Sequence, residues 1–243
     1  MENGMLKCDF HAHTSDDPYD IIPHSGKQLI DEYARQGFDV VAITMHGKVL
    51  SSRELQAYAR KKGILLVPGA EGFIEGQDAV EGKHVLFLNA SQREVDSVRT
   101  IEGLRKFRES RGKSGKPFIV IAPHPFYLLQ SCLGKLLEEN PDCFDAVEYC
   151  HFYTSSFNIF NRKAERFAKR HGKPLVGLGD VHTLLQVGWT YTLVKSKRSV
   201  PAILDALKAG SVELRTRPLP FFVFLRLLFF LLFSLARVKR QHK

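Results

Sequence analysis

Short apolar runs alternate along the chain with segments whose apolar residues recur at helical spacing. The apolar runs, which are typical of strands buried on both faces, are 6–13, 38–44, 64–71, 83–89, 118–125, 146–152 and 174–182. The segments with helical spacing are 25–37, 51–63, part of 91–111, part of 127–142 and 158–172. A last strand at 190–196 and a helix at 200–210 follow. This alternation predicts a parallel barrel or a doubly wound sheet, with functional groups at the carboxyl ends of the strands.

Two of the predicted helices have recognisable ends. Ser25 precedes LIDEYARQG and is a suitable N-cap residue, because its hydroxyl can accept a hydrogen bond from the first helical turn. Gly37 ends this helix, and Gly63 ends the helix that follows. RGKSGKP, at 111–117, is predicted to be a loop.

Residues 215–243 have a different pattern from the rest of the chain. After RTRPLP, whose prolines interrupt regular structure, the segment 221–236 is apolar except for Arg226 and Ser234, and RVKRQHK follows it. We therefore divide the chain into a main α/β domain, 1–214, and a basic tail, 215–243, that carries a hydrophobic helix.

Three environments fit this hydrophobic helix. Basic residues flank it, which favours a helix lying on an anionic membrane surface through residues 218–243. Its hydrophobicity is nearly all round, however, and a clear polar face is missing. A short transmembrane anchor is the second alternative, although sixteen residues with an internal Arg226 fall short of the ~20 that normally span a bilayer. The third is a helix packed against the barrel or a partner subunit.

Length and charge limit the class of protein. The 243 residues suit one α/β domain with a substantial core. The formal net charge is +9, but seven basic residues and no acids lie from Arg215 onward. Removing these seven charges leaves about +2 for the first 214 residues. A nearly neutral body disfavours binding to long nucleic acids, which usually requires a basic folded surface.

The cysteines and the N-terminus predict a cytoplasmic protein. The tail adds the prediction of a peripheral position at the inner membrane face. Cys8, Cys132, Cys143 and Cys150 form no CxxC pair, so free thiols in a reducing compartment are expected. MENGMLKCDF does not resemble a signal peptide. Cys8 is predicted to belong to the core.

Histidines and acids gather at the ends of the predicted strands. Asp9, His11 and His13 alternate, so their side chains share one face of a strand. Asp180 and His182 repeat this spacing at the end of another strand. The complete set is His11, His13, His46, Glu71, His84, His124, Asp180 and His182, of which His84 alone begins its apolar run. Imidazole and carboxylate groups converging in this number predict a multinuclear site for zinc, iron or manganese.

The remaining histidines are interpreted as structural. His24, His171 and His242 lie outside the set, and His171 is predicted to occupy a helix C-terminus, where a cation is favoured. His151 follows a strand, so a role in the site stays an alternative.

The motifs HAHT, TMH, GAEG, HVL, PHP and GLGDVH occur in this order and resemble the PHP (polymerase and histidinol phosphatase) family over residues 6 to about 200. The resemblance implies a distorted (β/α)7 barrel with two or three divalent ions per chain. One ion would be held by His11, His13, Glu71 and Asp180. A second would be held by Glu71, His84 and His124. A third would be held by His46, His182 and an acid from SDDPYD.

Three positions make this assignment less complete. The acid in SDDPYD could be Asp16, Asp17 or Asp20, and spacing favours Asp17. Met45 stands where relatives commonly have Asp before the histidine, and Gly179 stands where Ser is frequent. The loss of a polar group around the ligands would retune the site rather than abolish it.

The resemblance implies hydrolysis of a phosphoester by metal-activated water. The expected substrate is a small phosphomonoester, nucleotide or short oligonucleotide, selected by loops 72–82 and 126–135. His46 or His182 could act as a general acid, and Asp180 is counted with them among the catalytic residues. Arg162 and Lys163 are candidates for holding the substrate phosphate, with ordinary solvated helix charges as the alternative.

Two other functions fit the sequence less well. An amidohydrolase-like metallohydrolase would often use a carboxylated lysine, and strands three to five have no lysine at a comparable strand end. A non-catalytic metal-binding module tethered to a membrane is suggested by Met45 and by the tail.

Overall fold

The computed structural model describes residues 4–50 and 52–241, and the side chains of its last helix up to Ser234. Ten strands lie within the described residues: β1 (Leu6–Asp9), β2 (Val40–Met45), β3 (Lys48–Val49), β4 (Leu65–Ile74), β5 (Lys83–Leu88), β6 (Ile119–Ala122), β7 (Ala146–Cys150), β8 (Leu175–Leu178), β9 (Thr190–Val194) and β10 (Val212–Thr216). The α-helices of the same residues are α1 (Gly26–Arg35), α2 (Arg53–Lys61), α3 (Gln92–Ser97), α4 (Ile101–Ser114), α5 (Lys135–Glu139), α6 (Ile159–Arg170), α7 (Val200–Lys208) and α8 (Phe221–Gln241).

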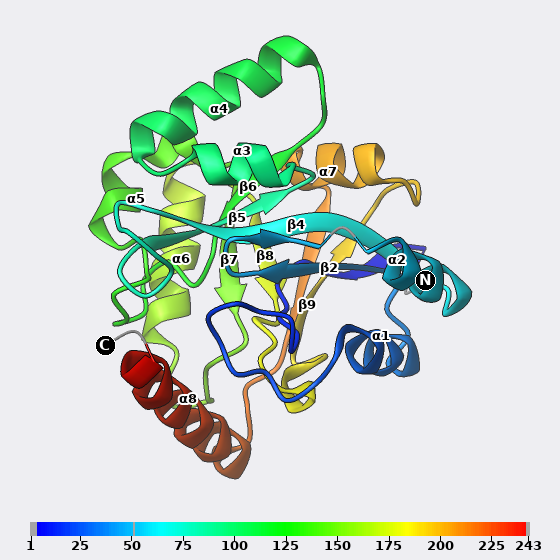
Figure 1. Ribbon diagram of the computed structural model, residues 1–243, viewed down its shortest axis with the longest axis vertical. Coiled ribbons are helices and arrows are strands. Elements are labelled where there is room, and N and C mark those ends of the chain that lie inside the picture. The colour runs from blue at the N-terminus through cyan, green and yellow to red at the C-terminus, as the bar shows by residue number, and fades with distance from the viewer. Residues whose placement is uncertain (1–3, 51, 242–243) are drawn as a thin grey trace.

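The strands form a sheet that curls into a nearly closed barrel, with helices around it (Figure 1). The strand order is β10-β9-β1-β2-β4-β5-β6-β7-β8, and β3 pairs with β2. The sheet nearly closes where β8, at one end of this order, meets β9, which is second from the other end. Thr192 of β9 donates a hydrogen bond to the Gly177 carbonyl of β8, at 2.8 Å. A Cβ at Gly177 would lie 2.7 Å from the Tyr191 carbonyl oxygen, so glycine permits this close approach. The distorted α/β barrel expected from the family resemblance is confirmed.

The barrel departs from a fully parallel arrangement at β5, which is antiparallel to both β4 and β6. Because β5 runs in the opposite direction, its first residues lie at the edge where the neighbouring parallel strands end. This reversal explains why His84 begins its apolar run while the other members of the set end theirs. β9 and β10 are also antiparallel to their neighbours, and the sequence pattern did not predict β10.

The core consists of a barrel interior and of layers between the sheet and the helices. Leu6, Cys8 and Phe10 pack in the interior cluster, which also contains Ile203 and Leu207 of α7. Cys8 is therefore a core residue, as predicted. All four cysteines are buried free thiols.

Most predicted helices are present, with changes at their ends. Ser25 caps α1 and accepts from the Gln28 backbone N–H. The segment 91–111 forms two helices, α3 and α4, and α4 continues to Ser114, so the loop predicted from residue 111 begins later than expected. Gly115, in the left-handed region at φ +65°, ends α4.

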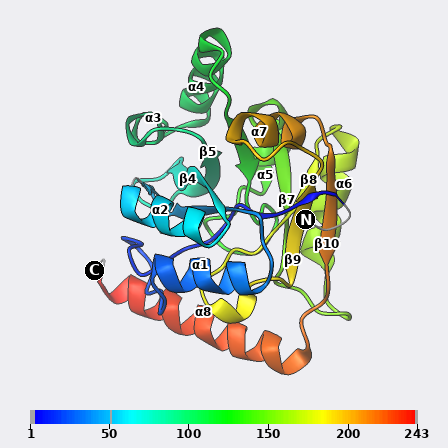
Figure 2. The same cartoon turned by 90° about the vertical axis from the view of Figure 1, so that its right-hand side faces the viewer.

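The C-terminal helix α8 lies along the lower edge of the barrel in both views, on the side opposite α4 and α7 (Figures 1 and 2). The preceding segment is tied to the body, because the Leu219 backbone N–H donates to the Tyr153 carbonyl at 2.9 Å. Phe224 of α8 packs against Phe152, with ring centroids 4.7 Å apart. α8 thus contacts the barrel. None of the helices, over the part of each that is described with its side chains, is long and apolar enough to cross a membrane.

Candidate metal centre

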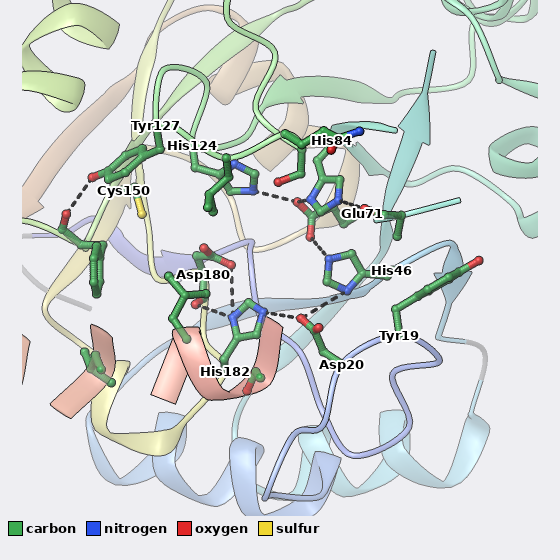
Figure 3. Close-up of a pocket in the computed structure, with 18 of the residues that line it drawn as sticks. Tyr19, Asp20, His46, Glu71, His84, His124, Tyr127, Cys150, Asp180 and His182 are labelled. Atoms are coloured by element: carbon green, nitrogen blue, oxygen red, sulfur yellow. Dashed lines mark hydrogen bonds and ion pairs between the residues drawn. The ribbon is translucent and has the colours of Figure 1, made fainter. Parts of the chain in front are cut away.

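Glu71, near the middle of β4, lies at the centre of the histidine cluster (Figure 3). Its Oε2 atom lies 3.1–3.3 Å from the Nε2 atoms of three imidazoles, those of His11, His13 and His46. Its Oε1 atom lies 3.0 Å from His124 Nε2 and 2.9 Å from His84 Nδ1. The side chain is 1 % exposed. One buried carboxylate thus faces five of the predicted histidines.

Three donor atoms beside Glu71 are buried and have no hydrogen-bond partner: His11 Nε2, His13 Nε2 and Asp180 Oδ1. They lie within 4.8 Å of one another. A buried polar atom without a partner is costly, so such atoms are rare in folded proteins. Nitrogen and carboxylate oxygen donors are suitable ligands for zinc, iron or manganese. The residues therefore fit a divalent cation.

Further donor groups share the same residues. Within the described chain, ligand atoms also converge in three other groups: His11 with Glu71 and His124, His46 with Glu71 and His84, and His13 with Asp17 and His46. These groups pair His124 with His11 and His84 with His46, whereas the family resemblance implies that His84 and His124 share one ion. His182 belongs to none of the four groups.

The loop after HAHT contributes two acids. Asp17 accepts from His13 Nδ1 at 2.8 Å and lies 3.1 Å from His46 Nδ1. Asp20 lies 2.9 Å from His182 Nε2. Asp16 pairs with neither histidine in this way. It is exposed, and its backbone carbonyl accepts a hydrogen bond from the Lys48 ammonium group. The sequence favoured Asp17 as the partner of both His46 and His182, and the structure divides that role between Asp17 and Asp20.

Glu148 is a site residue that the sequence reasoning missed. It is fully buried in β7, where its Oε2 accepts from His11 Nδ1 at 3.0 Å and from the His124 backbone N–H at 3.1 Å. A carboxylate on the second ring nitrogen fixes the tautomer and orientation of a ligating histidine. The available signal was an acid inside the otherwise apolar strand AVEYC.

Two candidate ligands have left-handed backbone conformations. His124 has φ +29° and Asp180 has φ +42°. Such conformations are unfavourable for residues other than glycine and concentrate at functional sites. Gly179 precedes Asp180, and a Cβ there would overlap the Asp9 carboxylate. A serine at position 179 would therefore require Asp9 to move.

Asp9 and Met45 lie beside the cluster but do not join it. Asp9 accepts from the Tyr33 hydroxyl at 2.8 Å and from the Gly179 backbone N–H at 3.0 Å, so it braces β1 against the segment after β8. Met45 is fully buried in the apolar core, with its sulfur 3.4 Å from the Thr14 hydroxyl. A core side chain thus stands where relatives commonly have a carboxylate.

The cluster shifts the pKa values of its members in opposite directions. Burial lowers the pKa of His11, but nearby Glu71 and Asp180 outweigh it and raise the value well above the usual range. The pKa of His182 is raised to about 9, because Asp180 and Asp20 outweigh its burial. Burial raises the pKa of Glu71, but the surrounding imidazoles hold it well below the usual range. Clustered groups with strongly shifted pKa values mark candidate functional sites.

The remaining candidates have local structural roles. His24 Nε2 donates to the His13 carbonyl at 3.0 Å, and His171 caps the C-terminus of α6, as expected. His151 contacts Gln186 at 3.0 Å and lines the pocket without joining a ligand group.

The candidates for holding the substrate phosphate lie outside the pocket. Lys163 pairs with Glu138 at 2.9 Å. Neither Lys163 nor Arg162 lines the pocket, which favours ordinary helix charges for both. His242 lies outside the described residues.

The cluster forms one side of a pocket of about 370 Å³ (Figure 3). His46, His84, His124, Asp180 and His182 reach its surface together with Glu71. The loop that follows His124 and α8 also line this pocket. The volume lies in the range of small-molecule sites.

Comparison with known proteins supports the relationship that the motifs indicate. Residues 158–212 match the family model described as PHP-associated. The DNA polymerase III PolC-type of Streptococcus sanguinis is 36 % identical over 74 residues, which cover 30 % of this chain and 5 % of that protein. The Streptococcus thermophilus protein of the same name is 35 % identical over 95 residues, covering 39 % and 6 %. The chain thus spans only about a twentieth of the length of these relatives.

Solved structures share the fold over most of the chain. A two-domain protein from Bacteroides vulgatus, described as containing a predicted PHP-like metal-dependent phosphoesterase, has a TM-score of 0.63 and 20 % identity, covering 92 % of this chain and 69 % of its own. A lesion-specific endonuclease from Pyrococcus furiosus has a TM-score of 0.57 and 12 % identity, covering 86 % and 57 %. The ordered motifs, the PHP-associated match and the shared barrel together support a relationship to the PHP family.

Proposed function

We propose that the chain is a metal-dependent phosphoesterase that hydrolyses a small phosphomonoester or nucleotide. The observation that carries this proposal is the convergence of His11 Nε2, His13 Nε2 and Asp180 Oδ1, buried and without a hydrogen bond, beside Glu71. The fold neighbour described as a predicted metal-dependent phosphoesterase supports the same class of reaction.

We assign the ligands to two main ion positions and a third. His11, His13 and Asp180 would hold one divalent ion, and Glu71 would bridge to a second ion near His84 and His124. His46 and His182, with Asp17 and Asp20, would complete a third position. Bound manganese, zinc or iron would supply an activated water and would neutralise the phosphate charge. Neither lysine nor arginine is among the described residues that line the pocket, so these side chains could not neutralise the phosphate in place of the ions.

His182 is our candidate for the general acid. It reaches the pocket with 19 % of its side chain exposed, compared with 6 % for His46. Its Nε2 lies 2.9 Å from Asp20 Oδ2, and its Nδ1 lies 3.0 Å from the Asp180 carbonyl oxygen, so both ring nitrogens face acceptors. Where no ion occupies the third position, this arrangement favours a protonated ring, which could deliver a proton to the leaving oxygen.

The test is phosphate release by the purified full chain. The chain is stripped with EDTA, reloaded with manganese, zinc or iron, and assayed on a panel of phosphomonoesters and nucleotides. His11→Ala and Asp180→Ala should each abolish release and lower metal content by elemental analysis. His171→Ala, on the C-terminus of α6, is the matched control and should do neither. Wild-type turnover in both site variants would refute the proposed centre, whereas metal binding without turnover by the wild-type chain would support the non-catalytic alternative.

An endonuclease activity is the second candidate, because a lesion-specific endonuclease shares the fold. An endonuclease Q solved in complex with a 27-mer duplex substrate that has an abasic lesion shares the fold as well. Two features of this chain favour a small substrate instead. The body carries only about +2, and the pocket has no lysine or arginine among its described lining side chains. A metal-supplemented nuclease assay on abasic duplex DNA would separate the two candidates.

We also propose that the C-terminal segment, residues 218–243, rests on an anionic membrane at its inner face. The exposed side of α8 carries large apolar residues, including Phe222 at 83 % and Phe229 at 75 % exposure. Basic residues and no acids accompany it in the sequence from residue 215 onward. Because β10 extends to Thr216, we place the domain boundary after this residue rather than after Leu214.

Flotation with lipid vesicles tests the membrane proposal. The full chain should float with vesicles containing phosphatidylglycerol and remain behind with phosphatidylcholine alone, since anionic lipid attracts the basic residues. Phe222→Ser combined with Phe229→Ser should abolish flotation, because the apolar contact is lost. Equal flotation of this variant and the wild type would contradict the proposal.

A further inference from the structure

The pocket beside the metal-ligand cluster has an apolar wall that the proposed chemistry does not require. Leu227, Phe230 and Leu231 of α8 form part of it, and Leu227 is 4 % exposed. Phe152, which also lines the pocket, packs against Phe224 of the same helix. A phosphate bound among the imidazoles would therefore have hydrocarbon on its open side.

The polar side chains on the pocket surface are largely committed to the protein. The Tyr127 hydroxyl donates to the Phe152 carbonyl at 2.9 Å. Gln130 donates to the Glu81 carbonyl at 3.3 Å, and Gln186 donates to the Asp180 carbonyl at 2.9 Å. A sugar or a base would need such groups to replace its hydrogen bonds with water, since unpaired polar groups are costly to bury. An alkyl group would not.

The apolar wall continues to the rim of the pocket. Leu128 and Leu129, in the loop after His124, line the pocket and are 87 % and 40 % exposed. Large exposed apolar side chains at a pocket entrance are typical of sites for apolar ligands.

We infer that the substrate is an amphiphilic phosphoester, with its phosphate at the imidazole cluster and an alkyl group against Leu227, Phe230 and Leu231. The inference rests on the proposed phosphoesterase function and specifies its substrate class. Removing an alkyl group from water strengthens binding by about fourfold per methylene. Affinity should therefore rise steeply with chain length until the wall is covered.

Non-hydrolysable alkylphosphonic acids test this inference without requiring turnover. The manganese-loaded full chain is titrated calorimetrically with ethyl-, butyl- and hexylphosphonic acid below micelle-forming concentrations. We expect Kd to fall at least about tenfold from the ethyl to the hexyl compound. Treatment with EDTA should weaken all three, because the phosphonate binds at the metal centre.

Two neighbouring phenylalanines provide a matched pair of variants. Phe230→Ser, on the pocket side of α8, should reduce the hexyl-to-ethyl ratio of affinities at least about threefold. Phe229→Ser, on the exposed side, should keep the wild-type ratio. Leu231→Ser serves the same purpose if Phe230→Ser does not fold.

Equal affinities for the ethyl and hexyl compounds would overturn the inference, and so would equal effects of the two phenylalanine variants. Neither result would affect the proposed phosphoesterase function, which fails only if a folded, metal-loaded chain releases no phosphate from any ester. The two failures are therefore read from different measurements.

Discussion

Two buried carboxylates at the mouth of the barrel have opposite surroundings. Asp9 is fully buried, and its partners are a tyrosine hydroxyl and backbone N–H groups. Glu71 is equally buried, but it faces imidazoles on several sides. Burial raises the pKa of Asp9 to about 6, since its neutral hydrogen-bond donors offset only part of that effect. The pKa of Glu71 falls well below the usual range, because the imidazoles outweigh its burial.

This contrast separates a structural acid from a ligand acid. Desolvation acts on both side chains, so the difference arises from the neighbours. Asp9 joins two segments of backbone, while Glu71 collects donor groups from β5 and from the segments that follow β1, β2 and β6. The proposed chemistry should therefore depend on Glu71 and tolerate a change at Asp9.

The largest expected difference comes from the same isosteric change at both positions. Glu71→Gln should reduce phosphate release by at least about a thousandfold, because a neutral amide cannot bridge two cations and roughly 4 kcal/mol of stabilisation is lost. Asp9→Asn should keep release within about tenfold of wild type. Steady-state rates with saturating manganese measure both. Similar losses in the two variants, with folding verified by circular dichroism, would erase the distinction.

A pH titration of stability provides the next largest effect. The carboxyl of Asp9 has its ordinary pKa of 3.8 when unfolded and a pKa of about 6 when folded. The folded state thus binds this proton more tightly, and its stabilisation is complete below pH 4 and lost as the pH rises through 6. The shift corresponds to about 3 kcal/mol. Denaturant unfolding of metal-free wild type and Asp9→Asn should show the variant gaining about this amount relative to wild type between pH 4 and 7. A difference that stays constant with pH would contradict the raised pKa.

The sequence predicted the strand-end residues because strand periodicity and strand ends are local properties. His11 and His124 were found in this way, and His84 stood out as the one histidine at a strand start. Glu71 was found although its strand, predicted to end there, continues to Ile74. The reversal of β5 that explains His84 depends on pairing with β4 and β6, which no local pattern contains.

Residues that act from within the core escaped prediction for a related reason. Glu148 lies inside a strand whose other residues are apolar, so the sequence marks it only as a buried position. Its hydrogen bond with His11 Nδ1 depends on β7 lying beside the segment that carries His11. The division of partners between Asp17 and Asp20 depends on the path of one loop. The inner face of α8 likewise acquires its meaning from the pocket beneath it, whereas the sequence showed only that the helix is apolar on nearly all sides.

Glu148 offers an intermediate effect that sharpens the distinction between orienting and ligating acids. Glu148→Gln retains the size of the side chain but weakens its hydrogen bond to His11 Nδ1, so manganese affinity should fall by about 10- to 100-fold. Competition with a chromophoric chelator measures the change. Glu165→Gln, on the exposed side of α6, is the control and should leave the affinity unaltered. An unchanged affinity in Glu148→Gln would assign the residue to packing alone.

The smallest expected effect concerns Met45, which occupies a position where relatives commonly have a carboxylate. Its side chain is fully buried in a cluster with apolar residues of α1, α2 and β2, and its sulfur accepts a hydrogen bond from the Thr14 hydroxyl. Met45→Leu conserves volume and should cost less than about 1.5 kcal/mol of stability. Phosphate release should stay within about twofold of wild type, because the ligand atoms of His46 keep both Asp17 and Glu71 as neighbours. A more than tenfold fall in release by a stably folded variant would instead show that the thioether acts on the metal centre. Met45 would then belong to the site rather than to the core.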